Sequence, residues 1–121
     1  MFKYAGAAVS WKCKRQLVVA FSTAEAEYIA VSKAAQEMIY LQWIQLDLGE
    51  EIVEGYVLHK DTKGCMDLGN HPSALDRTKH IDILVFFLLQ AVADGHVWLV
   101  SCRTNEMTAD MMTKALSGPA L

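Results

Sequence analysis

Two long runs of helical character dominate the pattern of apolar and polar positions. Residues 22–48 contain no Gly or Pro, and Gly49 then follows as a residue that commonly ends a helix. Residues 79–94 are rich in large apolar side chains, and Gly95 follows them in the same way. We therefore predict two helices, the second of them mostly buried.

Three shorter stretches are predicted to contain strands. Residues 7–21 hold two β-rich patches around a basic centre, and residues 55–61 form a short strand that ends in a carboxylate. The segment HVWLVSC at 96–102 alternates too little for an exposed strand, so we expect it at the centre of a sheet. NEMTADMMTKAL, residues 105–116, predicts a closing helix capped by Thr104. Strands that alternate with helices in this way favour an α/β layered domain.

The composition is that of one compact domain over residues 1–121. The chain is 53% hydrophobic and has only two prolines, which argues against disorder. Its net charge of −3 argues against attachment to nucleic acid by bulk electrostatics alone. Any contact with nucleic acid must therefore be local.

Cysteine usage and hydrophobicity indicate an intracellular chain outside the membrane. Cys13, Cys65 and Cys102 are odd in number and widely spaced, so neither a disulfide framework nor a zinc site is predicted. The most apolar run, ILVFFLLQAVA from Ile83, falls well below the roughly 20 residues that span a bilayer. The N-terminus has no secretory pattern.

Two glutamates, two residues apart, open the first helix. Ser22 and Glu25 have the spacing of a capping box, in which each side chain accepts a hydrogen bond from the other residue's backbone amide. At about 100° per residue, Glu27 points nearly opposite to Glu25. Glu25 shares its side with Ser32 and Gln36, and Glu27 shares a stripe with Val31, Ala34, Met38 and Leu41. Glu25 therefore has a structural role, and Glu27 needs another explanation.

Glu27 and two aspartates are candidates for chemistry. A carboxylate on the sheet-facing stripe is costly to bury without a cation or a donor, although Glu27 could also be a partly exposed residue favoured by the helix dipole. Asp61 ends a strand, where active-site carboxylates of α/β sheets commonly lie and where turn-forming aspartates are equally common. Asp110, taken alone, reads as a solvated helix residue.

Together, these three carboxylates could converge on divalent metal. Hard oxygen ligands suit Mg²⁺ or Mn²⁺. Two such ions about 4 Å apart can activate water and stabilise the leaving oxygen in phosphodiester cleavage. The spacing of the residues leaves their convergence open.

Three ordered motifs resemble a known family: VSWKCKRQLVVAFSTAEAEYIAVSKAAQE, DRTKHIDI and TADMMTKAL. They closely resemble the C-terminal RNase H domain of copia-type LTR retrotransposon Pol polyproteins, through nearly the whole chain. The resemblance implies an RNase H-like fold, a mixed sheet flanked by helices. It also implies hydrolysis of the RNA strand of RNA/DNA hybrids with Mg²⁺ or Mn²⁺, and assigns catalytic and metal-binding roles to Glu27, Asp61 and Asp110.

The chain departs from the family pattern in several places. The family's first catalytic Asp lies on a strand upstream of VSW, so the resemblance implies an N-terminally truncated domain without its first, central strand. Leu84, Val85 and Phe86 stand where the family usually has Arg, Tyr and His, and Thr62 replaces a common Asn. The loop SCRTNEM brings no histidine that could help product release, and His96 reads as structural.

Two small basic patches are candidates for nucleic-acid contact. The first consists of Trp11, Lys12, Lys14 and Arg15, and the second of Arg77, Lys79 and His80. Either could meet the phosphates or sugar hydroxyls of an A-like hybrid, and either could equally be ordinary solvated charge.

The sequence thus predicts an RNase H-like segment of a retrotransposon polyprotein with three of four catalytic carboxylates, inactive as an isolated chain. Alternatives are a domesticated, non-catalytic module that binds nucleic acid or protein, and a fragment with no role. The expected partners are an RNA/DNA hybrid, the upstream reverse transcriptase and integrase segments, and a second copy through an exposed sheet edge, with no membrane. The expected location is the cytoplasm, within a virus-like particle, or the nucleus.

Overall fold

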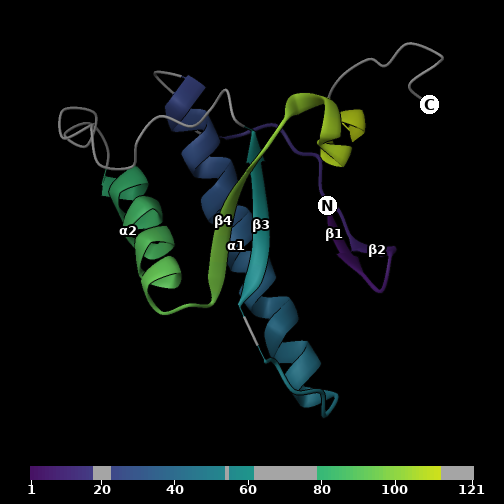
Figure 1. Cartoon of the computed structure of the whole chain (residues 1–121). Helices are drawn as coiled ribbons and strands as arrows, with labels where there is room; N and C mark the ends of the chain where they lie inside the picture. The colour runs from purple at the N-terminus through teal and green to yellow at the C-terminus, as the bar shows by residue number, and fades with distance from the viewer. Residues whose placement is uncertain (18–22, 54, 62–78, 113–121) are drawn as a thin grey trace.

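The computed structural model describes residues 1–17, 23–53, 55–61 and 79–112 (Figure 1). At residues 23, 24, 61, 79–82, 110 and 111 it describes the backbone alone. The elements in chain order are β1 (Phe2–Tyr4), β2 (Ala7–Ser10), α1 (Thr23–Asp47), β3 (Tyr56–Asp61), α2 (Lys79–Ala93), β4 (Val97–Cys102) and the 3-10 turns η2 (Thr104–Glu106) and η3 (Thr108–Met112). The chain is therefore of the α/β class.

The strands that the structure describes form two separate sheets of two strands each, whereas the resemblance implies a single mixed sheet. β1 and β2 pair antiparallel as a hairpin, and its turn residues Ala5 and Gly6 have φ values of 49° and 82°. β3 and β4 pair in parallel, from Tyr56 beside Val97 to Asp61 beside Cys102. Within the described ranges, no strand joins the two sheets.

Both helices end at the glycine that the sequence predicts. Gly49 has a φ of 84°, its amide donates to the Leu46 carbonyl at 2.9 Å, and the Glu50 amide donates to the Gln45 carbonyl at 3.1 Å. This arrangement satisfies carbonyls at the helix end and needs a left-handed residue, which favours glycine. Gly95, with a φ of 76°, ends α2 in the same way.

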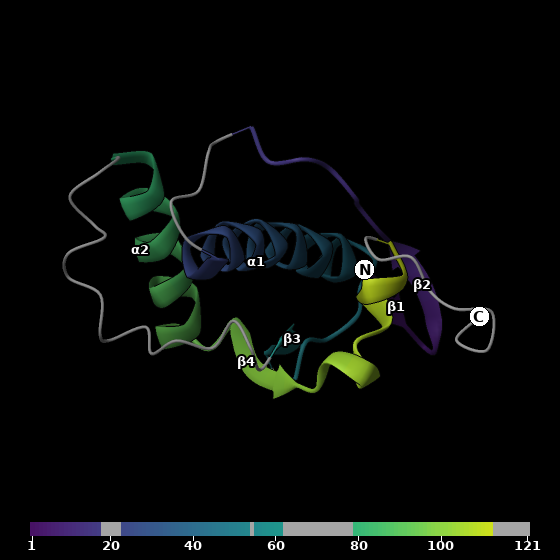
Figure 2. The same cartoon turned by 90° about the horizontal axis from the view of Figure 1, so that it is seen from above.

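The core lies where α1 and α2 pack together against the β3–β4 sheet. Its buried side chains are Ala35, Met38, Leu88, Ala91 and Val97. A second, smaller cluster joins Ile29 of α1 to Leu84 of α2. Figure 2 shows α2 beside the first part of α1, and the β1–β2 hairpin on the opposite side of the molecule. The hairpin still reaches the core, because Phe2 packs against it.

Two predictions about burial are wrong. Ile83 and Phe86 are 66% and 70% exposed, so α2 is buried along one face only, the face that contacts α1 and β4. Among the described strands β4 pairs only with β3, so it lies at a sheet edge, and its Trp98 is 59% exposed. In this chain, a long run of apolar residues therefore predicts more burial than the structure has.

The predicted closing helix is not continuous through its described part. Residues 104–112 form two 3-10 turns, η2 and η3, separated by Met107. Thr104 is the first residue of η2, and Arg103 holds the cap position without a capping side-chain hydrogen bond. Thr104 therefore lies one residue past the cap position that the sequence predicts for it. No helix in the described part of the chain combines the length and apolar character that crossing a membrane requires.

Candidate functional site

The elements that carry the three predicted carboxylates approach one end of the molecule (Figure 1). Glu27 lies near the start of α1, and Asp61 is the last residue of β3, where its backbone pairs with Cys102. The chain then leaves β4 at this same end and enters η3, which contains Asp110. The side chains of Asp61 and Asp110 lie outside the described residues, so only their backbone positions are known.

Seen from above, these elements are spread across that end. Figure 2 shows the start of α1 on the side of α2, and η3 on the side of the β1–β2 hairpin. Among the side chains that the structure describes, no three of His, Cys, Asp or Glu are grouped closely enough to hold a metal ion. Convergence of Glu27, Asp61 and Asp110 on metal stays a prediction.

The two glutamates of α1 lie on different sides of the helix. Glu25 is buried, 8% exposed, on the same side as Ile29 and Ser32, and this side faces α2. Glu27 is half-buried. The sequence predicts that the two glutamates point in nearly opposite directions, and their different burial agrees with this. The sequence did not indicate that the side of Glu25 packs against α2. Ser22 of the predicted capping box lies outside the described residues.

The buried side chains of α1 lie on a different side of the helix in each half, because the two halves of the helix pack against different neighbours. In the first half, the Ser32 hydroxyl donates to the Leu84 carbonyl of α2 at 3.0 Å. In the second half, Gln42 donates through Nε2 to the His96 carbonyl at 2.9 Å, just before β4. Met38 packs between these points in the main core.

The first basic patch lies on a segment that connects two parts of the candidate site. The Cys13 thiol donates to the Met112 carbonyl of η3 at 3.3 Å. Three residues later, Gln16 donates through Nε2 to the Ala26 carbonyl at 2.9 Å, one residue before Glu27. The segment therefore runs from the turn that carries Asp110 to the helix start that carries Glu27.

The side chains of this segment are available to a ligand. Trp11 is 64% exposed, and Lys12, Lys14 and Arg15 are all exposed. Cationic groups beside an exposed aromatic ring are suited to phosphates and to a sugar or base face. Of the second patch, Lys79 and His80 open α2 but have no described side chains, and Arg77 lies outside the described residues.

Gln16 and Cys13 were not identified from the sequence, because their partners lie 10 and 99 residues away. The same is true of the contact that fixes the β1–β2 hairpin at the far end of α1. There the Tyr4 hydroxyl donates to the Glu50 carboxylate at 2.5 Å, and Gln45 donates to the same oxygen at 3.1 Å. These bonds hold the pKa of Glu50 below its ordinary value, and the hydrogen bond and charge of Glu50 raise the pKa of Tyr4.

Comparison with known proteins shows the family to which the chain belongs. It is 39% identical over 116 residues to the retrovirus-related Pol polyprotein from transposon TNT 1-94 of Nicotiana tabacum, a match that covers 96% of the chain. It is 33% and 31% identical to the Pol polyproteins from transposons RE1 and RE2 of Arabidopsis thaliana, over 93% and 90% of the chain. Over most of its length the chain is homologous to retrovirus-related Pol polyproteins.

The Pol homology covers a small part of each relative. The chain spans 9% of the tobacco polyprotein and 8% of each Arabidopsis polyprotein. No family model matches the chain, and no solved structure matches it. The homology therefore places the chain as a segment of a Pol polyprotein, and the activity of that segment is a matter for proposal.

Proposed function

We propose that this Pol segment is RNase H-like and acts on RNA/DNA hybrids, with metal-dependent hydrolysis of the RNA strand as its reaction. The observation that carries the proposal is the course of the basic segment. Cys13 and Gln16 fix it to η3 and to the start of α1, beside two of the three candidate carboxylates. A hybrid held by Lys12, Lys14 and Arg15 would lie next to these elements.

The donor set fits Mg²⁺ or Mn²⁺. Glu27, Asp61 and Asp110 offer hard carboxylate oxygens, and their backbones lie at one end of the molecule. These residues would hold the ion. Bound metal would activate water and stabilise the leaving oxygen of the phosphodiester.

The basic segment would supply binding and orientation. Lys12, Lys14 and Arg15 would neutralise phosphates of the hybrid, and Trp11 would contact a sugar or base face. Because the net charge of the chain is −3, this local group of cations has to offset repulsion from the rest of the surface.

A second candidate function is hybrid binding without cleavage. The sequence matches three of the four carboxylates that the resemblance assigns to catalysis. Binding needs only the basic segment, whereas cleavage also needs Glu27, Asp61 and Asp110 to converge on metal. We therefore expect the 121-residue chain to bind a hybrid more readily than it cleaves one.

The decisive experiment measures binding and cleavage of a labelled RNA/DNA hybrid by the purified chain, in Mg²⁺ and in Mn²⁺. Metal-dependent cleavage that disappears in Asp61→Asn supports the nuclease, since that variant controls for contaminating enzymes. Binding without cleavage supports the second candidate. A folded chain that neither binds nor cleaves a hybrid rejects both.

The two glutamates provide a matched test of the site. Glu27→Gln is expected to abolish any metal-dependent cleavage. Glu25→Gln is expected to keep it, and to lower the free energy of unfolding by about 1 kcal/mol. The opposite result, with activity lost only in Glu25→Gln, would show that the wrong glutamate has been assigned to the metal.

A further inference from the structure

The basic segment, residues 11–15, lies along the first half of α1. At one end Gln16 bonds to the Ala26 carbonyl, and at the other the Ser10 hydroxyl donates to the Glu37 carboxylate at 3.0 Å. Ala26 and Glu37 are eleven residues apart, which is close to three full turns, so the two anchors lie on one line along the helix. Figure 2 shows the segment, in purple, on the side of α1 away from β3 and β4.

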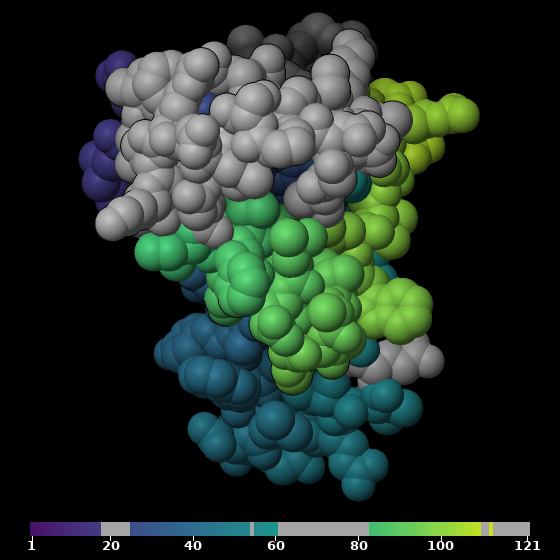
Figure 3. Space-filling model, turned by 90° about the vertical axis from the view of Figure 1, so that its left-hand side faces the viewer, coloured from purple at the N-terminus to yellow at the C-terminus, as the bar shows by residue number. Residues whose placement is uncertain are grey.

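The same line continues into the second half of α1 as an exposed apolar surface. Tyr40, Ile44 and Leu48 follow it, each four residues after the last, and they are 56%, 37% and 77% exposed. Trp43 lies beside them and is 63% exposed. Figure 3 shows this end of α1, in blue and teal, projecting beyond α2, in green. The outward side of a surface helix is usually polar, so these side chains indicate a contact with another molecule.

The charge around these apolar side chains is negative. No Lys or Arg occurs in the sequence between Lys33 and Lys60, whereas Asp47, Glu50 and Glu51 are all exposed here. Aromatic ring faces attract cations, and nearby carboxylates add to this attraction. We call the exposed side chains of residues 40–51 the acidic surface. It is suited to a partner that presents cations together with an apolar side chain.

The basic segment of a second copy has this chemistry. It presents Lys12, Lys14 and Arg15 beside Trp11, and all four side chains are exposed. Within one copy its hydrogen bonds hold the segment over residues 26–37, away from the acidic surface. We propose that two copies form a symmetric dimer in which the basic segment of each lies on the acidic surface of the other. This inference is independent of the proposed nuclease function.

One two-fold axis satisfies both contacts, because the basic segment and the acidic surface lie along the same helix. An axis in the plane of contact, perpendicular to α1 near its middle, aligns the two α1 helices antiparallel. The first half of each helix then faces the second half of the other, and the opposite charges meet twice. Since the dimer covers the basic segment, a second copy and a hybrid bound there exclude each other.

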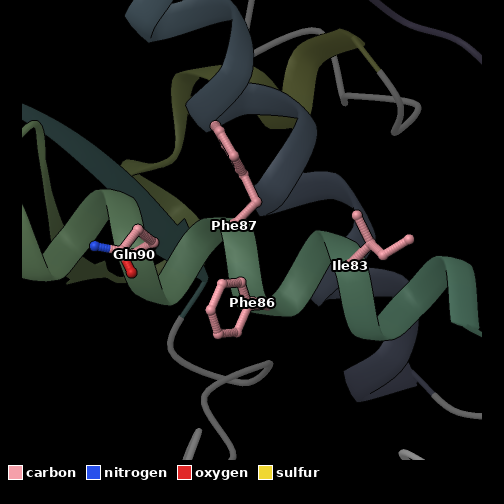
Figure 4. A pocket seen from close by; sticks show the side chains of 4 residues that line it. All are labelled: Ile83, Phe86, Phe87 and Gln90. Carbon is pink, nitrogen blue, oxygen red and sulfur yellow. The ribbon is translucent and has the colours of Figure 1, made fainter.

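A second exposed apolar site lies on α2. It is a hollow lined by Ile83, Phe86, Phe87 and Gln90 (Figure 4). This lining contains no charged residue, so charge does not select a partner for it. The hollow therefore provides a control surface of similar exposure for the proposed contact.

The test is the mass of the whole chain in solution, measured by sedimentation over a range of concentrations at low salt. We expect twice the 13.5 kDa of one chain at high concentration, and dissociation when added salt screens the charges. Trp43→Lys is expected to give the single-chain mass, because it removes the ring and places a positive charge opposite the basic segment. Phe86→Lys is the matched control, since Phe86 is 70% exposed but lies in the α2 hollow, outside the contact.

An exchange of charge tests which surfaces meet. One variant combines Lys12→Glu, Lys14→Glu and Arg15→Glu, and a second combines Asp47→Lys and Glu51→Lys. Each variant alone is expected to weaken the dimer by about tenfold or more, because both symmetric contacts become repulsive. An equal mixture of the two variants should regain the dimer mass, because each changed surface then meets the opposite charge.

Circular dichroism of each variant confirms that it is folded. A single-chain mass for the unmodified protein at all concentrations overturns the proposal, and so does a mass that grows beyond two chains. A mixture of the charge variants that stays dissociated also overturns it, as does equal dissociation by Trp43→Lys and Phe86→Lys.

Discussion

At the scale of single residues, the contribution of a buried polar group to stability depends on whether it has a hydrogen-bond partner. Ser32 is fully buried, and its hydroxyl donates to Leu84 of α2. Ser32→Ala is expected to lower the free energy of unfolding by about 1 kcal/mol, the usual net value of such a hydrogen bond. Urea denaturation measures the change. Ser10→Ala serves as the control, since its 3.0 Å bond to Glu37 is exposed, and an equal effect of both substitutions would contradict the argument.

Tyr56 presents the opposite case. Its hydroxyl is buried and has no hydrogen-bond partner among the described residues, and burial raises its pKa. Tyr56→Phe keeps the ring and removes the cost of burying the hydroxyl, so the free energy of unfolding is expected to stay the same or rise by up to about 1 kcal/mol. A clear loss of stability in urea denaturation would mean that the hydroxyl has a partner.

At the scale of elements, the connection before β3 depends on a glycine. A Cβ on Gly55 would overlap the Gly95 carbonyl oxygen and come within 2.7 Å of the Trp98 ring. Backbone on one side and an indole on the other leave little room to adjust, so Gly55→Ala is expected to cost on the order of 3 kcal/mol. Gly6→Ala is the control: it has a φ of 82° but open space, and is expected to cost about 1 kcal/mol. Thermal unfolding of both variants compares the two costs.

The β1–β2 hairpin is expected to respond to pH through Tyr4 and Glu50. The folded-state pKa of Glu50 is lowered, so its stabilising contribution is present above the ordinary value of 4.5 and is lost as the pH falls below it. The pKa of Tyr4 is raised, so its contribution is present below its ordinary value of 10.0 and is lost as the pH rises beyond it. Protection factors of the β1 amides, which correct for the intrinsic pH dependence of exchange, should therefore be highest between these limits, and Glu50→Gln should remove the acid limb.

The sequence correctly predicted the ends of both helices, because nearby residues determine them. It did not predict burial and strand position, because contacts between distant parts of the chain determine these. Gly49 and Gly95 end their helices because a left-handed residue is needed there, and that need is visible in the sequence. The exposed side of α2 and the edge position of β4 depend on which elements pack together, and an apolar run does not encode this. Glu25 and Glu27 lie on different sides as predicted, but the neighbour of Glu25 had to come from the structure.

At the scale of the whole molecule, charge is distributed unevenly despite a small net value. The basic segment runs between η3 and the start of α1, whereas Glu50 and Glu51 follow the other end of the same helix. The segment begins just after Ser10, which bonds to Glu37 at 3.0 Å, so the stretch of α1 from Glu37 to Asp47 separates its near end from these glutamates by roughly 15 Å at 1.5 Å per residue. This distance exceeds the screening length of about 8 Å at physiological salt, so the acidic end opposes binding only weakly.

This separation leads to a prediction about salt. If phosphates meet the basic segment, changing Lys12, Lys14 and Arg15 together to Gln should reduce the slope of log binding constant against log salt concentration by about 2 to 3 for a hybrid. Replacing the exposed Lys3 and Lys33 with Gln is the control, because both lie outside the segment and should leave the slope nearly unchanged. Fluorescence anisotropy with a labelled hybrid measures both slopes. Equal slopes for the two variants would place the nucleic acid elsewhere on the surface, and the argument that ties the basic segment to Glu27 would fail with it.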